Sequence, residues 1–249
     1  MDRGTVHPAK HPANRARGFS LLETLIALFV MSILMTAVLS QIGQVQQRAR
    51  TEQIKLDIFQ QSREFMDQFT RDIRQTGYPT KRMFDTASWS TALASPDTSD
   101  SRLAVGVTKI APNEVVFEGD VDGDGRVDVL DYKRGSTGDD CPCLKRSQVL
   151  KSTGGTVFSS QVQNVQSAGT DADPIFVAYT AAGAAVTSAD MTTTAGKASL
   201  ASIRTVQFTI KVKAGSLDPK THQAPETSLA GQALLRNCSM AAIGQPNSC

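Results

Sequence analysis

The stretch Phe19–Leu39, FSLLETLIALFVMSILMTAVL, decides how the rest of this 249-residue chain is organised. Its 21 residues contain a single charged side chain, Glu23. About 20 consecutive apolar residues are needed for a helix to cross a bilayer. Arg15 and Arg17 lie directly before the stretch, and positive charge at that end favours a cytoplasmic N-terminus. We therefore expect a membrane helix over residues 19–42 with the rest of the chain on the outer side.

The charge of the chain is uneven. Overall it has 26 basic and 24 acidic residues, so no strong field attracts nucleic acid. The excess of positive charge lies in a basic leader, residues 1–18, which carries Arg3, Lys10, Arg15 and Arg17 against Asp2. His222 is the only histidine outside the leader. That composition argues against a histidine-based catalytic centre or a histidine-rich metal site, and no nucleophile or phosphate-binding motif is present.

Two simpler interpretations of the apolar stretch are a secretory signal peptide and a plain membrane anchor. A signal peptide has an apolar region of about 7–15 residues followed by a small-residue cleavage site, and this run is longer and lacks that site. A plain anchor gains nothing from Glu23, because a carboxylate near the bilayer centre costs about 2.5–3.5 kcal/mol. If the chain were cut between Gly18 and Phe19, a new α-amine from a neighbouring copy could neutralise Glu23.

The segment Arg17–Glu23, RGFSLLE, resembles the cleavage and methylation motif of type IV pilins and type II secretion pseudopilins. The resemblance implies that a prepilin peptidase removes residues 1–18 after Gly18 and that Phe19 is N-methylated. It implies that Glu23 serves assembly among similar helices. The implied partners are other major and minor pilins and an inner-membrane assembly platform. The implied location is the inner membrane with a periplasmic head, and later the pilus or cell surface.

The helix is expected to continue to Thr76, as an amphipathic segment over residues 43–77. Its apolar face is spaced as in one side of a helix, with Ile54, Ile58, Phe65, Phe69 and Ile73. Gly77 and Pro79 then provide a stop. The stretch Arg71–Tyr78, RDIRQTGY, resembles the corresponding stretch of PilW-like minor pilins. Pseudopilins of the J class share such a helix and are the nearest competitors.

Residues 78–249 are expected to form a β-rich head, an antiparallel sheet laid on the helix in an α+β fold like that of type IV pilins. Gly154 and Gly155 predict a hairpin turn. Two segments are expected to be loops, Asp85–Arg102 and Ala181–Ala201. The predicted strands are Glu114–Phe117, Val127–Tyr132, Gln148–Leu150, Thr156–Phe158, Ile175–Tyr179, Thr205–Val212 and the tail Leu229–Asn237, which resembles the last strand of PilW-like pilins.

Residues 120–131, DVDGDGRVDVLD, have the spacing of a calcium-binding loop. Gly125 stands where the template needs a sharp turn, and Arg126 would contribute its backbone carbonyl. The alternative is a solvated Asp/Gly hairpin, but five carboxylates in twelve residues repel one another without a cation. We therefore expect a structural Ca²⁺ ion in a strand–loop–strand site. The expected carboxylate ligands are Asp120, Asp122, Asp124, Asp128 and Asp131.

The chain has four cysteines: Cys141, Cys143, Cys238 and Cys249. An exported head matures in an oxidising compartment, which favours disulfides. Four cysteines allow three pairings, and the sequence does not choose among them. Pairing Cys238 with Cys249 would resemble the C-terminal loop of many pilins. A four-cysteine zinc site is the alternative, but its spacings suit zinc poorly.

The sequence thus predicts a non-enzymatic filament subunit, a PilW-like minor pilin that takes part in type IV pilus assembly or priming. One alternative is a minor pseudopilin of a type II secretion system. Another, from a different class, is a membrane-anchored binding module whose head depends on calcium.

Overall fold

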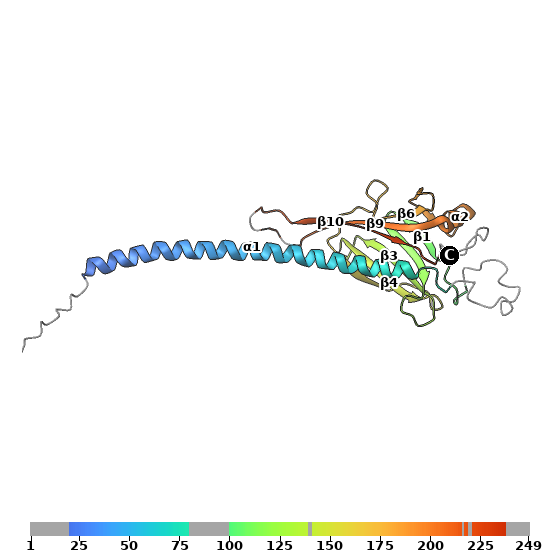
Figure 1. Cartoon of the computed structure of the whole chain (residues 1–249), viewed down its shortest axis with the longest axis horizontal. Helices are drawn as coiled ribbons and strands as arrows, with labels where there is room; N and C mark the ends of the chain where they lie inside the picture. Colours follow the sequence, from blue (N-terminus) through green and yellow to red (C-terminus); the bar gives the residue numbers. More distant parts are fainter. Residues whose placement is uncertain (1–19, 80–99, 139–140, 216, 219–220, 238–249) are drawn as a thin grey trace, which may run out of the picture. The chain divides into compact units, whose positions relative to one another are not determined.

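The computed structural model describes residues 20–79, 100–138, 141–215, 217–218 and 221–237 (Figure 1). The chain divides into two compact units, Met1–Ala49 and Arg50–Cys249. The predicted cleavage residues Gly18 and Phe19 lie outside the described residues, as do residues 85–99 of the predicted loop.

Helix α1 spans Leu21–Gln75, which confirms the predicted helix over its described part. The helix stops where the sequence predicts, because Gly77 adopts a φ of 79° that glycine reaches without steric cost. Asn237 supports this end, since its side-chain amide lies 3.2 Å from the carbonyl oxygen of Thr76. The tail of the described chain therefore caps the helix.

The head contains two antiparallel sheets, where the sequence predicted one. The six-stranded sheet has the order β5-β4-β3-β2-β1-β8, and the four-stranded sheet has the order β10-β9-β6-β7. The short helix α2, Thr194–Ser202, precedes β9. The strands are β1 (Val107–Ala111), β2 (Glu114–Gly119), β3 (Asp128–Gly135), β4 (Cys143–Leu150), β5 (Phe158–Gln163), β6 (Phe176–Thr180), β7 (Ala185–Val186), β8 (Ala189–Asp190), β9 (Ile203–Lys213) and β10 (Glu226–Leu234).

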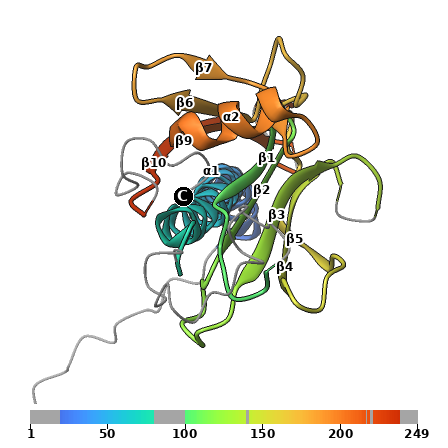
Figure 2. The same cartoon turned by 90° about the vertical axis from the view of Figure 1, so that its right-hand side faces the viewer.

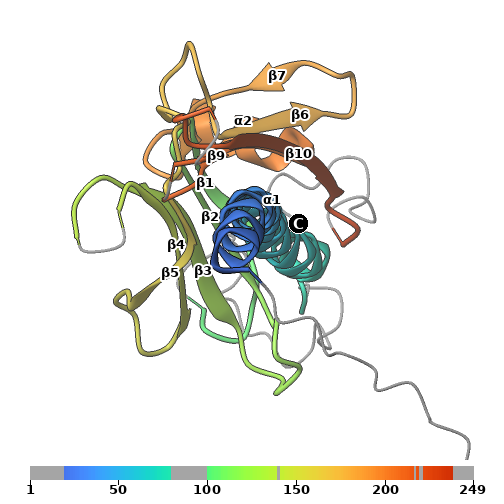
Figure 3. The same ribbon diagram turned by 90° about the vertical axis from the view of Figure 1, so that its left-hand side faces the viewer.

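The second half of α1 packs between the two sheets (Figures 2 and 3). The rings of Phe65 and Phe69 meet Tyr132 of β3, with centroids 5.9 and 5.1 Å away. The same two rings meet Phe208 of β9, at 5.5 and 4.9 Å. These edge-to-face contacts add to the burial of large apolar surface. One aromatic cluster therefore joins the helix to both sheets.

Most of the predicted strands are confirmed. β2, β3, β6, β9 and β10 overlap the predicted strands, and β4 contains Gln148–Leu150. The predicted strand Thr156–Phe158 overlaps β5 only at Phe158, because β5 begins there and continues to Gln163. The segment Ala181–Ala201 is not one loop, since it contains β7, β8 and most of α2. Its small residues show little periodicity, but Thr193 caps α2 by accepting a hydrogen bond from the Gly196 amide.

A buried carboxylate ties α1 to the six-stranded sheet. Asp72 is 1% exposed. It accepts hydrogen bonds from the Tyr132 hydroxyl at 2.6 Å and from Nε of Arg146 at 2.9 Å. Gln68 donates a third bond at 2.7 Å. Burial, followed by the charge of Asp72, raises the pKa of Tyr132, so its hydroxyl stays protonated and continues to donate. The carboxylate of Asp72 thus has a cationic partner and two further hydrogen-bond donors within the head.

Replacing Asp72 by asparagine should destabilise the head by about 3–5 kcal/mol, because it leaves the mostly buried guanidinium of Arg146 without its ion-pair partner. The matched control is Asp67→Asn on an exposed part of the same helix, where the expected change is within about 0.5 kcal/mol. Denaturant unfolding of the detergent-solubilised chain measures both. Equal stabilities for the two variants would show that the Asp72 network does not hold the helix in place.

Candidate functional site

The first candidate region is the N-terminal part of α1. Every large apolar side chain from Leu21 to Val45 is exposed, and this helix is long and apolar enough to cross a membrane. Glu23 lies in the first helical turn and is also exposed. A carboxylate in the first turn faces the partial positive charge of the helix N-terminus, which stabilises the helix end. The same exposure leaves Glu23 accessible to a cation on another helix.

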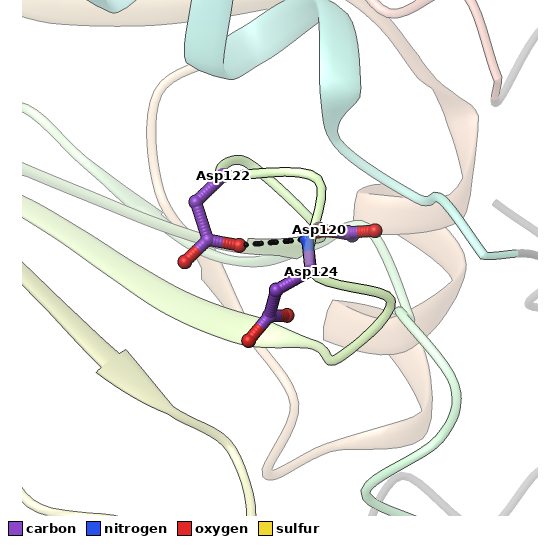
Figure 4. Close-up of side chains that lie close together, drawn as sticks. All are labelled: Asp120, Asp122 and Asp124. Carbon is purple, nitrogen blue, oxygen red and sulfur yellow. Dashed lines mark hydrogen bonds between the residues drawn. The ribbon is translucent and has the colours of Figure 1, made fainter.

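The second candidate region is the acidic loop between β2 and β3. Its glycines Gly123 and Gly125 have φ values of 78° and 81°, the left-handed conformation that the template predicts for a sharp turn. Oxygen atoms of Asp120, Asp122 and Asp124 all lie within 4.8 Å of one another (Figure 4). The structure therefore brings the first three predicted ligands together.

Backbone amides of the loop orient these carboxylates. Asp120 is 6% exposed and accepts hydrogen bonds from the amides of Gly123 and Gly125, at 2.8 and 3.1 Å. Asp122 accepts one from the amide of Asp124 at 3.2 Å (Figure 4). Among the residues that the structure describes, no cationic side chain pairs with Asp120 or Asp122.

Asp124 is partly engaged by its neighbour. It accepts hydrogen bonds from the Arg126 amide and from Nε of Arg126, both at 2.8 Å. These bonds, the one from the backbone first, hold the pKa of Asp124 below its usual value. Asp124 therefore stays ionised, as a metal ligand must. A cation in the loop would compete with the Arg126 guanidinium for this carboxylate.

The two remaining predicted ligands do not join the group. Asp128 is buried at the start of β3 and accepts a hydrogen bond from Gln148 at 2.8 Å. Burial, and then repulsion from Asp122, Asp124 and Asp120, raises the pKa of Asp128, so it lies within electrostatic reach of the loop. Asp131 lies three residues further along β3 and faces the opposite side of the sheet. The loop template placed Asp131 in the site because it assumes a helix after the loop, and a strand follows here.

The structure joins Cys141 to Cys143 in a disulfide, one of the pairings that the sequence left open. Cys238 and Cys249 lie outside the described residues. His222 is exposed. The network of Asp72 was missed from sequence because Tyr132 and Arg146 are 60 and 74 residues away from it.

The N-terminal segment matches a family model described as the prokaryotic N-terminal methylation motif, over residues 13–39. This match contains Gly18, Phe19 and Glu23. It indicates a precursor of the type IV pilin and pseudopilin kind, which is consistent with a membrane-anchored helix and with the α+β architecture of the head. No curated protein and no solved structure matches the chain.

The environment of Asp131 makes the stability of the head depend on pH. Asp131 is 6% exposed, and one of its oxygens is buried without a hydrogen-bond partner. Burial, followed by the charge of Glu114, raises its pKa to about 6, while Lys133 and Lys109 act in the opposite direction. The folded head therefore holds a proton that the unfolded chain releases near pH 4.

Between about pH 4 and pH 6 the free energy of unfolding should fall as this proton is lost, and above pH 6 the full cost remains. Asp131→Asn has no ionisable group at this position. The difference in free energy of unfolding between this variant and the native chain should therefore change by about 1–3 kcal/mol in favour of the variant as the pH rises from 4 to 6. Denaturant unfolding at pH 4 and pH 7.5 measures the difference. A difference that stays constant with pH would contradict the assignment.

Proposed function

We propose that this chain is a minor pilin of the PilW-like kind, a structural subunit that primes or caps a type IV pilus. The observation that carries the proposal is the methylation motif together with a helix whose apolar half is exposed in the described chain. Prepilin peptidase would cut after Gly18, and the freed Phe19 would be methylated. Other pilins would then cover the apolar helix, and the assembly platform of the inner membrane would extract it.

The PilW-like assignment draws support from a contact in the head. The stretch Arg71–Tyr78 and the tail Leu229–Asn237 are the two segments that resemble PilW-like pilins. They meet in the structure, where the Asn237 amide reaches the carbonyl oxygens of Thr76, Gln75 and Arg74 at 3.2, 3.5 and 3.5 Å. The two segments that resemble PilW-like pilins therefore form one structural feature, the cap at the end of α1. Their joint presence supports the assignment more than two unrelated resemblances would.

Glu23→Ala tests the role in assembly. Removing the carboxylate leaves the incoming α-amine of a neighbour without its partner, so the variant should be cleaved normally but enter filaments at least about tenfold less. Thr24→Ala is the matched control in the same turn. Immunoblots of the sheared-filament fraction and of the membrane measure both. Native-level incorporation of the alanine variant at position 23 would refute an assembly role for this carboxylate.

A minor pseudopilin of a type II secretion system remains the second candidate, because the methylation motif serves both machines. Deletion of the gene that encodes this chain distinguishes the two candidates. For a minor pilin, surface fibres should be lost while exoprotein secretion continues. For a pseudopilin, fibres should persist and exoproteins should accumulate in the periplasm.

We also propose that the loop after β2 binds Ca²⁺ and stiffens the head. Ca²⁺ takes six to eight oxygen ligands. Asp120, Asp122 and Asp124 would supply carboxylates, with the backbone carbonyl of Arg126 and with Asp128 directly or through water. The support is that Asp120 is a buried carboxylate held by backbone amides with no cationic partner among the described residues. The third candidate function is a membrane-anchored binding module whose head binds its ligand only with Ca²⁺ in this loop.

Calorimetric titration of the solubilised chain should show Ca²⁺ binding in the range of extracellular sites, about 0.1–1 mM. Asp124→Ala should abolish the heat. Asp131→Asn, which removes an aspartate of the template that lies on the other face of β3, should leave it unchanged. No heat in the native chain at millimolar Ca²⁺ would refute the site, and loss of heat in the Asp131 variant would restore the full template.

A further inference from the structure

Strand β10 forms one edge of the four-stranded sheet (Figure 3). It is nine residues long and pairs with β9 without a bulge. The other edge strands of the described sheets are less suited to accept a partner: β7 and β8 have two residues each, and β5 is interrupted by an irregular register. β10 is therefore the longest regular edge in the described head.

The hydrogen bonds at its two ends show which backbone groups of β10 are free. The amide of Leu235 donates to the Arg204 carbonyl at 2.9 Å, and the amide of Ala214 donates to the Pro225 carbonyl at 2.7 Å. In an antiparallel ladder such bonded pairs recur at every second residue. The odd-numbered residues of β10 thus bond to β9. The even-numbered residues direct N–H and C=O outward: Glu226, Ser228, Ala230, Gln232 and Leu234.

The other side of β9 supports this phase independently. The amide of Thr209 donates to the Ile175 carbonyl at 2.8 Å, so odd residues of β9 bond towards β6. The even-numbered residues of β9 then bond to β10, where their partners are the odd-numbered residues. None of the five outward residues of β10 has another backbone partner in the described chain.

This edge lacks the features that shield free strands. Natural edges carry lysines, prolines or bulges that block pairing with another chain. The five outward residues are all exposed, contain no proline or lysine, and include a single charge, that of Glu226. A row of five amides and carbonyls without a backbone partner in the described chain, on a strand of regular register, is complementary to the backbone of another extended segment.

An apolar groove lies at the beginning of the same strand. It has a volume of about 310 Å³ and runs between α1 and β10. Leu56 and Phe59 of α1 line it and are 53% and 50% exposed. Pro225 and Thr227 line its other side. In strand addition, backbone bonds supply affinity and pockets for side chains supply specificity, and this region offers both.

We propose that β10 accepts an extended segment of a different protein subunit as an added strand, with an apolar side chain of that segment in the groove. A second copy of this chain fits less well. Antiparallel pairing of two β10 strands would turn the α1 segments of the two heads, residues 50–75, in opposite directions, whereas the basic leader favours one orientation for every copy. The inference uses the proposed function only to place chain and partner on the same side of the membrane.

Hydrogen exchange of the full-length chain, resolved to single amides, tests this inference. The purified chain in detergent should exchange rapidly at Ser228, Ala230 and Gln232 and slowly at Leu229 and Ala233. In native membranes of the producing cell, the three even-numbered amides should slow by at least about tenfold. Open even-numbered amides in native membranes would overturn the proposal. So would protection in the purified chain, and protection that rises with its concentration would indicate a second copy.

Ala230→Pro removes an outward N–H without removing a ladder bond, and proline is tolerated at such edge positions. It should abolish the protection of Ser228 and Gln232 in native membranes while Leu229 and Ala233 stay protected. Ala230→Val, which keeps the N–H, should retain it. Protection that survives proline would also overturn the proposal. The N-terminus of the protein in the same sample is also sequenced. A processed chain with unprotected even-numbered amides would refute strand addition but not the filament function. An unprocessed chain with protected amides would refute the filament function but not strand addition.

Discussion

The apolar first half of α1 is left uncovered by the rest of the chain that the structure describes, and such a surface needs an apolar environment. From Leu21 to Val45 its large apolar side chains are exposed on every side of the helix. Burying such a side chain is worth about 1.5–3 kcal/mol, so the free energy of leaving all of them in water is large. A bilayer satisfies this need for an anchored helix, and in the proposed function a bundle of similar helices satisfies it after assembly. In that proposal Glu23 is costly in the bilayer and useful in the bundle, where a partner amine neutralises it.

The second half of the same helix obeys a different rule. From Thr51 onwards one face becomes buried, and Phe65, Phe69 and Ile73 enter the core between the two sheets. Asp72 fixes this face against β3 and β4 through Tyr132 and Arg146. The Arg50–Cys249 unit thus contains its own core and its own polar anchor. The groove and the free edge of β10 also lie on this unit.

Local pattern determined how much of this could be predicted. The helix and its stop at Gly77 were clear, because apolar spacing, glycine and proline act within a few residues. β9 was clear because Val206, Phe208, Ile210 and Val212 alternate with polar residues. The second sheet, the partners of Asp72 and the face of Asp131 depend on contacts between distant residues. A template spacing cannot encode the face of a strand, which is why Asp131 was assigned to the loop although it points away from it.

The central claim is that cleavage after Gly18 lets the apolar helix assemble with similar helices, with Glu23 as the carboxylate that a partner amine neutralises. Mass spectrometry of the mature N-terminus, on protein taken from the cells that make it, tests this claim most directly. The account predicts a chain that begins at Phe19 and carries a methyl group on its α-amine. A mature chain that still carries residues 1–18, or one cut elsewhere and unmethylated, would contradict it.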